Sequence, residues 1–155
     1  MTRPLTLCIA IADGEHARFI QPDSANALRT ISSLDSASAH LHSRDIGSDG
    51  PGRAFESAAT ARHGVGERQD LHAMAKERFV RLVGEQLNAA SGRGEFDELL
   101  LVAPPRALAE LRETLDAATR VKLVGTLEKD LMRTPDHQLW PHVREWVSPK
   151  QRPVA

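Results

Sequence analysis

The fold of this chain is decided by the stretch Phe96-Asp97-Glu98-Leu99-Leu100-Leu101-Val102-Ala103-Pro104-Pro105. A short apolar run bounded by polar and turn-forming residues is typical of a strand buried on both faces of a sheet. The two prolines end the strand because neither supplies an N–H to a sheet ladder. Ligands of open α/β sheets bind beyond the carboxyl ends of such strands, so we expect residues 103–106 to lie beside any site.

A helix is expected directly after this strand. Pro105 suits the first position of a helix, where a backbone N–H has no partner within the helix. Apolar side chains then recur at three- and four-residue steps, which gives the helix one stripe to pack on the sheet. The stripe consists of Leu108, Leu111, Leu115 and Ala118.

Length and composition exclude several classes of protein. The chain has 155 residues and a formal net charge of -1, which predicts one domain without a general attraction to nucleic acid or membranes. No apolar run reaches the roughly 18 residues that span a bilayer. The apolar segment Leu5–Ala12 is shorter than a secretory signal of about 15–30 residues, and we interpret it as the first strand. Cys8 is the only cysteine, which excludes an internal disulfide and favours the cytoplasm.

The first part of the chain predicts an antiparallel meander followed by a long loop. Asp13-Gly14 is a hairpin-turn signal between the first two strands. Residues 41–69 have no periodic pattern and are rich in glycine and arginine. A connection longer than about 12–15 residues is uncommon in a compact domain and is usually functional or disordered, so we predict a Gly/Arg loop here. The strands are expected at residues 5–12, 17–21 and 28–34.

A long helix is expected after this loop. Asp70 is placed to cap its first turn, where a side-chain oxygen accepts hydrogen bonds from free backbone N–H groups. On the helix surface, Glu77 and Arg81 have the spacing of a favourable ion pair. Ser91-Gly92-Arg93-Gly94 is expected to end the helix, since glycine is common directly after a last turn.

The C-terminal third predicts one more strand and an interrupted helix. The strand is expected at residues 121–127, and Thr134-Pro135-Asp136 is a typical helix start. Pro141 should interrupt that helix, and residues 148–155 should form a flexible tail. The order of elements predicts a single α/β domain over residues 1–147, with helices packed on a mixed sheet.

The Gly/Arg loop holds the strongest candidate site. Arg53 and Arg62 carry planar guanidinium groups, which bind phosphate or carboxylate bidentately, and nearby glycines let backbone N–H groups approach an anion. If the loop folds back to the strand ends, these arginines would hold an RNA backbone or a small anion. In the alternative interpretation, Phe55 anchors a surface loop in which Arg53 and Glu56 pair with local partners.

Catalytic interpretations find less support in the sequence. Ser57 and His63 lack an identifiable third group that would orient the histidine as a base. Asp13 lies at the end of the first strand, where a ribonuclease-H-type nuclease places carboxylates that hold two metal ions. An Asp-Gly hairpin turn explains the same residue without catalysis, and we favour that interpretation.

The remaining polar residues suggest local structural roles. His40 and His42 are only two ligands, whereas zinc needs three or four from the protein, so no metal or other cofactor is predicted. Asp70 and His72 are expected to cap the long helix and face the loop, with a role in holding the loop closed as the alternative. The candidate binding residues are Asp13, Arg53, Phe55, Glu56, Ser57, Arg62, His63, Asp70 and His72.

A set of ordered motifs carries a family resemblance. The motifs are Ala12-Asp13-Gly14, Ala17-Arg18-Phe19, Gly52-Arg53-Ala54-Phe55-Glu56-Ser57, Asp70-Leu71-His72, Phe79, Leu101-Val102-Ala103-Pro104-Pro105, Leu111-Arg112, Glu128-Lys129-Asp130-Leu131 and Thr134-Pro135. Over about residues 5–140, the chain resembles bacterial proteins described as required for attachment to host cells. That family is related to the middle domain of archaeal and eukaryotic peptide-chain release factors.

The resemblance implies a ribonuclease-H-like α/β fold and suggests a ribosome-associated role. Release factors place water at the peptidyl-tRNA ester with a Gly-Gly-Gln tripeptide, which this sequence lacks. Peptidyl-tRNA hydrolysis is therefore not implied, and we do not expect an enzyme of that kind.

Three functional hypotheses follow. The leading one is a cytoplasmic, non-catalytic binding module that engages the ribosome, tRNA or related RNA through the Gly/Arg loop and affects attachment indirectly. Such binding should weaken steeply with salt. The second is a hydrolase or nuclease that acts at the strand ends near Asp13. The third is a protein–protein interaction module, and the sequence leaves its partner and the oligomeric state open.

Overall fold

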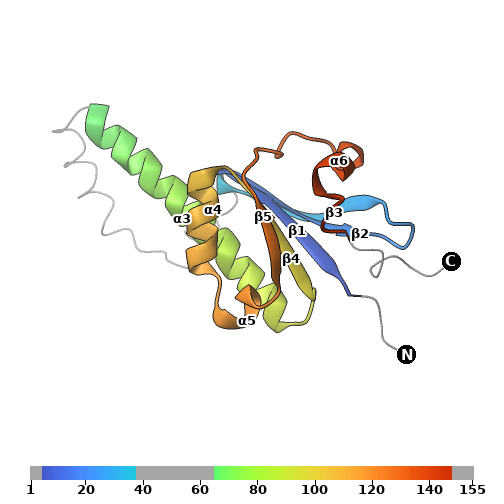
Figure 1. The fold of residues 1–155 in the computed structure, drawn as a ribbon. Coiled ribbons are helices and arrows are strands. Elements are labelled where there is room, and N and C mark those ends of the chain that lie inside the picture. The colour runs from blue at the N-terminus through green and yellow to red at the C-terminus, as the bar shows by residue number, and fades with distance from the viewer. Residues whose placement is uncertain (1–4, 38–64, 148–155) are drawn as a thin grey trace.

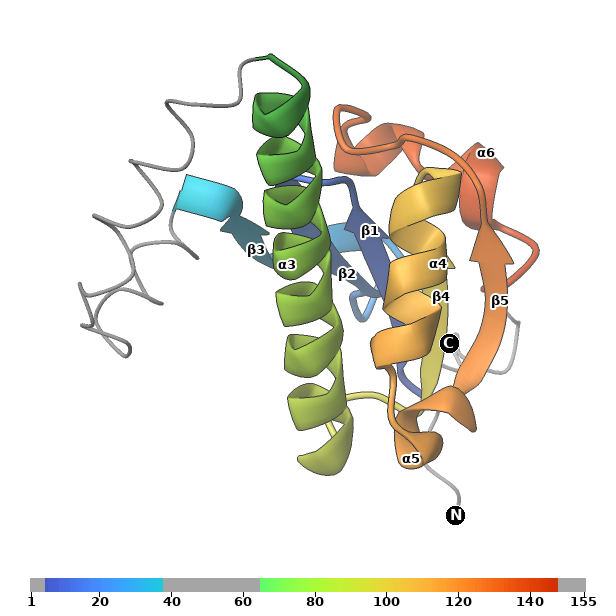
Figure 2. The same ribbon diagram turned by 90° about the vertical axis from the view of Figure 1, so that its left-hand side faces the viewer.

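The computed structural model describes residues 5–37 and 65–147, which form a five-stranded sheet covered on both faces (Figure 1). Figure 2 shows α3 and α4 side by side over one face of the sheet. The strands are β1 Leu7–Ala12, β2 His16–Pro22, β3 Leu28–Asp35, β4 Glu98–Val102 and β5 Leu123–Leu127. The helices are α3 Val65–Gly92, α4 Pro105–Thr114, α5 Ala117–Arg120, the 3₁₀ turn η1 Asp136–Gln138 and α6 Trp140–Val143.

The sheet is mixed, with the strand order β3-β2-β1-β4-β5. The first three strands form the predicted antiparallel meander, whereas β4 is parallel to β1 and β5 is parallel to β4. The predicted α/β class with helices packed on a mixed sheet is therefore confirmed. β4 lies inside the stretch that predicts it, and Leu99–Val102 are fully buried.

Two apolar cores explain why the central strands are apolar at every position. One core lies between the sheet and helices α3 and α4, and the other lies between the sheet and the C-terminal segment. A strand between two cores must bury both of its faces, which removes the usual alternation of polar and apolar residues. In β1, Cys8, Ala10 and Ala12 belong to the first core, and Leu7, Ile9 and Ile11 belong to the second.

The long helix begins earlier than predicted. α3 starts at Val65, so residues 65–69 are helical and not part of the loop, and Asp70 is an exposed position within the helix, not its cap. The three residues after Gly66 are good helix formers, and they offset the cost of about 1 kcal/mol for a glycine in a helix. The helix ends at Gly92, as predicted. Residues 41–64 of the predicted loop lie outside the described residues.

Two residues have surroundings that differ from the prediction: Arg81 has another ion-pair partner, and Ala118 belongs to another helix. Arg81 forms its ion pair with Glu110 of α4 at 3.1 Å, in place of the predicted partner Glu77. α4 ends at Thr114, so Ala118 falls in the separate helix α5 and is exposed. The other members of the predicted stripe, Leu108, Leu111 and Leu115, are buried.

The C-terminal segment holds less regular structure than predicted. The last strand starts at Leu123, two residues later than expected. η1 is a short 3₁₀ turn whose N-cap position is Pro135, so Thr134 does not cap it. The interruption predicted at Pro141 is confirmed, since α6 is a separate helix with this proline in its first turn. Val147 is buried in the second core.

Hydrogen bonds and an ion pair connect the C-terminal segment to strands β2 and β3. The guanidinium Nη1 of Arg18 in β2 donates to Asp136 Oδ1 at 2.9 Å, and Nη2 donates to the carbonyl oxygens of Leu131, at 2.7 Å, and Thr134. Thr30 in β3 donates its backbone N–H to Asp136 Oδ2 at 2.8 Å and its hydroxyl to Oδ1 at 2.6 Å. Partial burial raises the pKa of Asp136, but the hydrogen bonds from Thr30 and the charge of Arg18 outweigh it, and the pKa lies below its usual 3.8.

We expect Asp136→Asn to lower the free energy of unfolding by on the order of 2 kcal/mol at pH 7, because hydrogen bonds to a charged group are stronger than neutral ones. Since folding lowers the pKa of Asp136, its stabilising effect is complete above the unfolded pKa near 3.8 and is lost as the pH falls further. Urea denaturation at pH 7 and pH 3 measures both effects. Glu113→Gln, at an exposed position of α4, is the control. A difference that stays constant between the two pH values would contradict this account.

Candidate functional site

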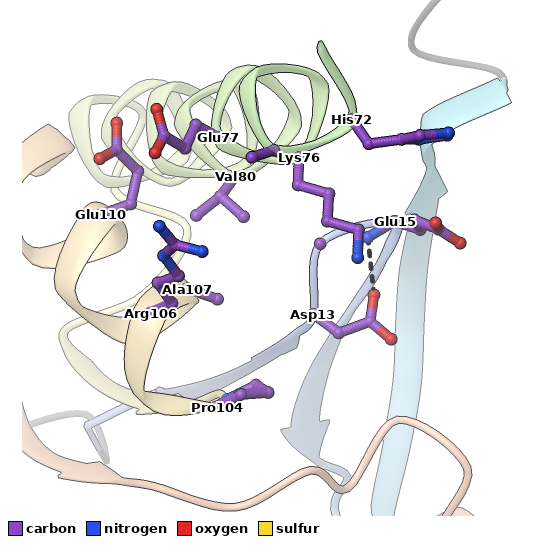
Figure 3. A pocket seen from close by; sticks show the side chains of 12 residues that line it. Asp13, Glu15, His72, Lys76, Glu77, Val80, Pro104, Arg106, Ala107 and Glu110 are labelled. Carbon is purple, nitrogen blue, oxygen red and sulfur yellow. Dashed lines mark hydrogen bonds between the residues drawn. The ribbon is translucent and has the colours of Figure 1, made fainter. Parts of the chain in front are cut away.

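A cavity of about 580 Å³ lies beyond the carboxyl ends of β1 and β4 (Figure 3). Its walls are the turn Asp13–Glu15, the face of α3 between His72 and Val80, and the start of α4 from Pro104 to Glu110. We call this cavity the hollow. From β1 the chain turns to β2 on one side, and from β4 it passes through α4 to β5 on the other, so the hollow lies where strand order reverses. Ligands of open α/β sheets bind at such a point.

The turn on one side of the hollow is fixed by the carboxylate of Asp13. Asp13 Oδ1 accepts hydrogen bonds from the backbone N–H groups of Glu15, at 2.8 Å, and His16, at 2.6 Å. His16 Nδ1 lies 3.6 Å from the same oxygen, and the backbone N–H of Asp13 donates to the carbonyl of His16 at 2.9 Å. The favoured interpretation of Asp13 as a turn residue is thus consistent with its contacts, which occupy one carboxylate oxygen.

Two cationic side chains, those of Lys76 and Arg106, flank the hollow. Figure 3 shows Lys76 reaching from α3 towards the turn, and Arg106 reaching from α4 towards α3. Within residues 5–37 and 65–147, no ion pair or hydrogen bond engages either side chain. The aliphatic part of Lys76 crosses Gly14 so closely that a Cβ there would lie 2.8 Å from its Cγ and Cδ.

The start of α4 adds backbone donors beside these cations. Pro104 occupies the N-cap position, and no side chain caps the helix. The first backbone hydrogen bond of this helix runs from the N–H of Leu108 to the carbonyl of Pro104 at 2.9 Å. The N–H groups of Arg106 and Ala107 precede it, and helix geometry leaves such groups free for an anion, next to the positive end of the helix dipole.

Carboxylates also line the hollow, and they limit what it can hold. Glu110 is neutralised by Arg81 at 3.1 Å. Asp13, Glu15 and Glu77 have no cationic lysine or arginine partner in the part of the chain that the structure describes. Within the described residues, the hollow therefore combines two cations that lack partners and a helix N-terminus with three acids at its edge, which suits one anionic group better than several.

The structure brings some of the predicted site residues together. Asp13 and His72 line the hollow, as do Pro104 and Arg106 from the stretch expected beside any site. Asp70 is exposed on α3 and does not line it. The other candidates lie outside the described residues: Arg53, Phe55, Glu56, Ser57, Arg62 and His63.

Lys76 lines the hollow but was not among the predicted site residues. In the sequence it lies between the apolar positions Ala75 and Phe79 of the predicted long helix, which indicated only solvent exposure. The signal was its spacing of four residues from His72, which places both side chains on one face of a helix. Among the described residues, no three histidine, cysteine, aspartate or glutamate side chains form a group that could hold a metal ion. No described helix combines the length and apolar character needed to cross a membrane.

Comparisons with known proteins assign the chain to a family. The chain is similar to the crystal structure of the archaeal translation termination factor aRF1, with 14% identity and a TM-score of 0.53. The likeness covers 94% of this chain but 36% of that one, so this chain spans about a third of the termination factor's length. No curated protein matches this chain. A family model described as "Protein required for attachment to host cells" matches residues 8–143, and the chain therefore belongs to this host-attachment family.

Proposed function

We propose that this protein is a non-catalytic binding module that engages the ribosome, tRNA or a related RNA, and that the hollow holds a phosphate of that RNA. The observation that carries the proposal is the pair of cations Lys76 and Arg106, which have no partner among the described residues, beside the uncapped N-terminus of α4. A phosphate between them would gain charge-assisted hydrogen bonds from both side chains and from backbone N–H groups.

The position of α3 connects the hollow to the Gly/Arg loop. Val65 begins α3 directly after that loop, and His72 follows it by about 10 Å along the helix axis at about 1.5 Å per residue. Arg53 and Arg62 precede Val65 in the sequence, and we propose that they contact the same RNA strand. The likeness to a translation termination factor favours a ribosomal partner.

The same residues give little support to catalysis. The sequence lacks the Gly-Gly-Gln tripeptide, and the carboxylate of Asp13 holds the hairpin turn. A two-metal nuclease needs several carboxylates around its ions, and the described residues provide no such group. We therefore propose binding without hydrolysis.

The first test is co-sedimentation with ribosomes through a sucrose cushion at low and high salt, together with tRNA binding by fluorescence anisotropy. The Lys76→Ala, Arg106→Ala double variant should bind about tenfold more weakly or worse, because each charge-assisted hydrogen bond contributes roughly 1.5–3 kcal/mol. Its affinity should also depend less on salt, since two phosphate contacts with their released counterions are lost. The Arg53→Ala, Arg62→Ala variant measures the contribution of the loop separately.

The matched control is Arg133→Ala, Arg144→Ala, which removes the same charge from exposed positions in the C-terminal segment, on the other face of the sheet. It should bind like the wild type, and RNase treatment should abolish pelleting for all variants. Equal binding by both double variants and the wild type would refute a role for the hollow. An equal loss of affinity in both double variants would show that binding depends on net charge and not on the hollow.

Gly14→Ala should weaken RNA binding several-fold without changing the thermal unfolding midpoint. A methyl group at this position would displace the side chain of Lys76, from whose Cδ it would lie 2.8 Å. In a Lys76→Ala background the same change should have no further effect, because the residue that it displaces is gone. A double-mutant cycle of anisotropy titrations measures this coupling. Additive losses would show that Gly14 acts through something other than Lys76.

A further inference from the structure

We propose that the hollow takes a terminal phosphate monoester of a nucleotide together with its nucleoside, and not an internal stretch of RNA backbone. The inference rests on the proposed function and names the part of the RNA that enters the site. Its basis is the distribution of charge around the hollow, together with the hollow's size and apolar floor.

Charge around the hollow permits only one phosphate. Among the described residues, Lys76 and Arg106 are the cations of the hollow that lack a partner, while Glu15 lies with Asp13 at the turn and Glu77 lies on the wall formed by α3. A strand running through would place its next phosphates beside these carboxylates, and like charges at short range repel. A phosphate at the end of a strand is followed by another phosphate on one side only.

A monoester also matches the two cations better than a diester. Its second ionisation has a pKa of about 6, so at pH 7 it carries close to two negative charges and three free oxygens. A backbone diester carries one charge and two free oxygens. Lys76, Arg106 and the first N–H groups of α4 together offer more donors than a diester can use.

The size and lining of the hollow leave room for the attached nucleoside. Its volume of about 580 Å³ lies within the range of roughly 300–1,000 Å³ that is usual for small-molecule sites. Ala73, Val80 and Ala107 give it an apolar floor. The carboxylate of Glu77, which has no lysine or arginine partner among the described residues, can accept hydrogen bonds from ribose hydroxyl or base amino groups. The described residues that line it include no phenylalanine, tyrosine or tryptophan, and only the imidazole of His72 could stack on a base, so base stacking should contribute little and base identity should matter little.

The nucleotide can come from an RNA end or from the free pool, and the experiment separates these sources. Anisotropy titrations compare one short RNA sequence with a 5′-phosphate, with a 3′-phosphate and with hydroxyl groups at both ends, the label being kept away from the phosphate. Free nucleoside monophosphates are added as competitors. We expect a phosphorylated end to bind at least tenfold more tightly than the hydroxyl-ended RNA. Lys76→Ala, Arg106→Ala should remove this difference, and Arg133→Ala, Arg144→Ala should retain it.

Each outcome has a distinct meaning. Equal affinity for phosphorylated and hydroxyl-ended RNA would overturn the inference and leave RNA binding intact. A phosphate preference that survives in the Lys76→Ala, Arg106→Ala variant would overturn it by placing the phosphate elsewhere. Competition by free nucleoside monophosphates at similar concentrations would support the site and identify the free nucleotide as a ligand. Binding of those monophosphates without any RNA binding would support the monoester site and refute the proposed function.

Discussion

The parallel pairing of β1 with β4 is the constraint on which the rest of the structure depends. The register runs from Leu7 opposite Glu98 to Ile11 opposite Val102, so both strands end at the same level. Because the two strands are buried on both faces, a shift by one residue would exchange the two sets of core side chains. The chain leaves β1 and β4 in opposite directions, and the hollow lies beyond the resulting gap between Asp13 and Pro104.

The sizes of the β1 side chains determine how the helices reach this gap. Towards α3 and α4 the strand presents Cys8, Ala10 and Ala12, and towards the C-terminal segment it presents Leu7, Ile9 and Ile11. Small side chains let a helix lie close to the sheet, which agrees with the close passage of Lys76 over Gly14. Burial, with a smaller contribution from Glu95, raises the pKa of Cys8 to about 12, so its thiol serves packing and stays protonated at neutral pH.

The sequence predicted what depends on local pattern and missed what depends on contact between elements. The unbroken apolar run before Pro104 predicted β4, and Asp13-Gly14 predicted the hairpin turn, since both signals lie within a few residues. The predicted ion-pair partner of Arg81 was wrong because the actual partner, Glu110, lies on another helix, and spacing within one helix cannot reveal it. The role of Lys76 could not be predicted for the same reason, because only the fold places it across the hollow from Arg106. The close approach of Lys76 from α3 also explains why residue 14 is a glycine.

The acids around the hollow give it a selectivity that its cations alone would not have. Lys76 and Arg106 attract any phosphate, and a site made only of such groups would bind every polyanion according to its charge. Glu15 and Glu77 oppose that attraction wherever a second phosphate would follow the first. A site can discriminate by repelling the wrong ligand as well as by attracting the right one. A likeness at 14% identity shows a shared fold only. Function depends on the side chains of the site, so the proposed function rests on the charges in the hollow and not on the fold.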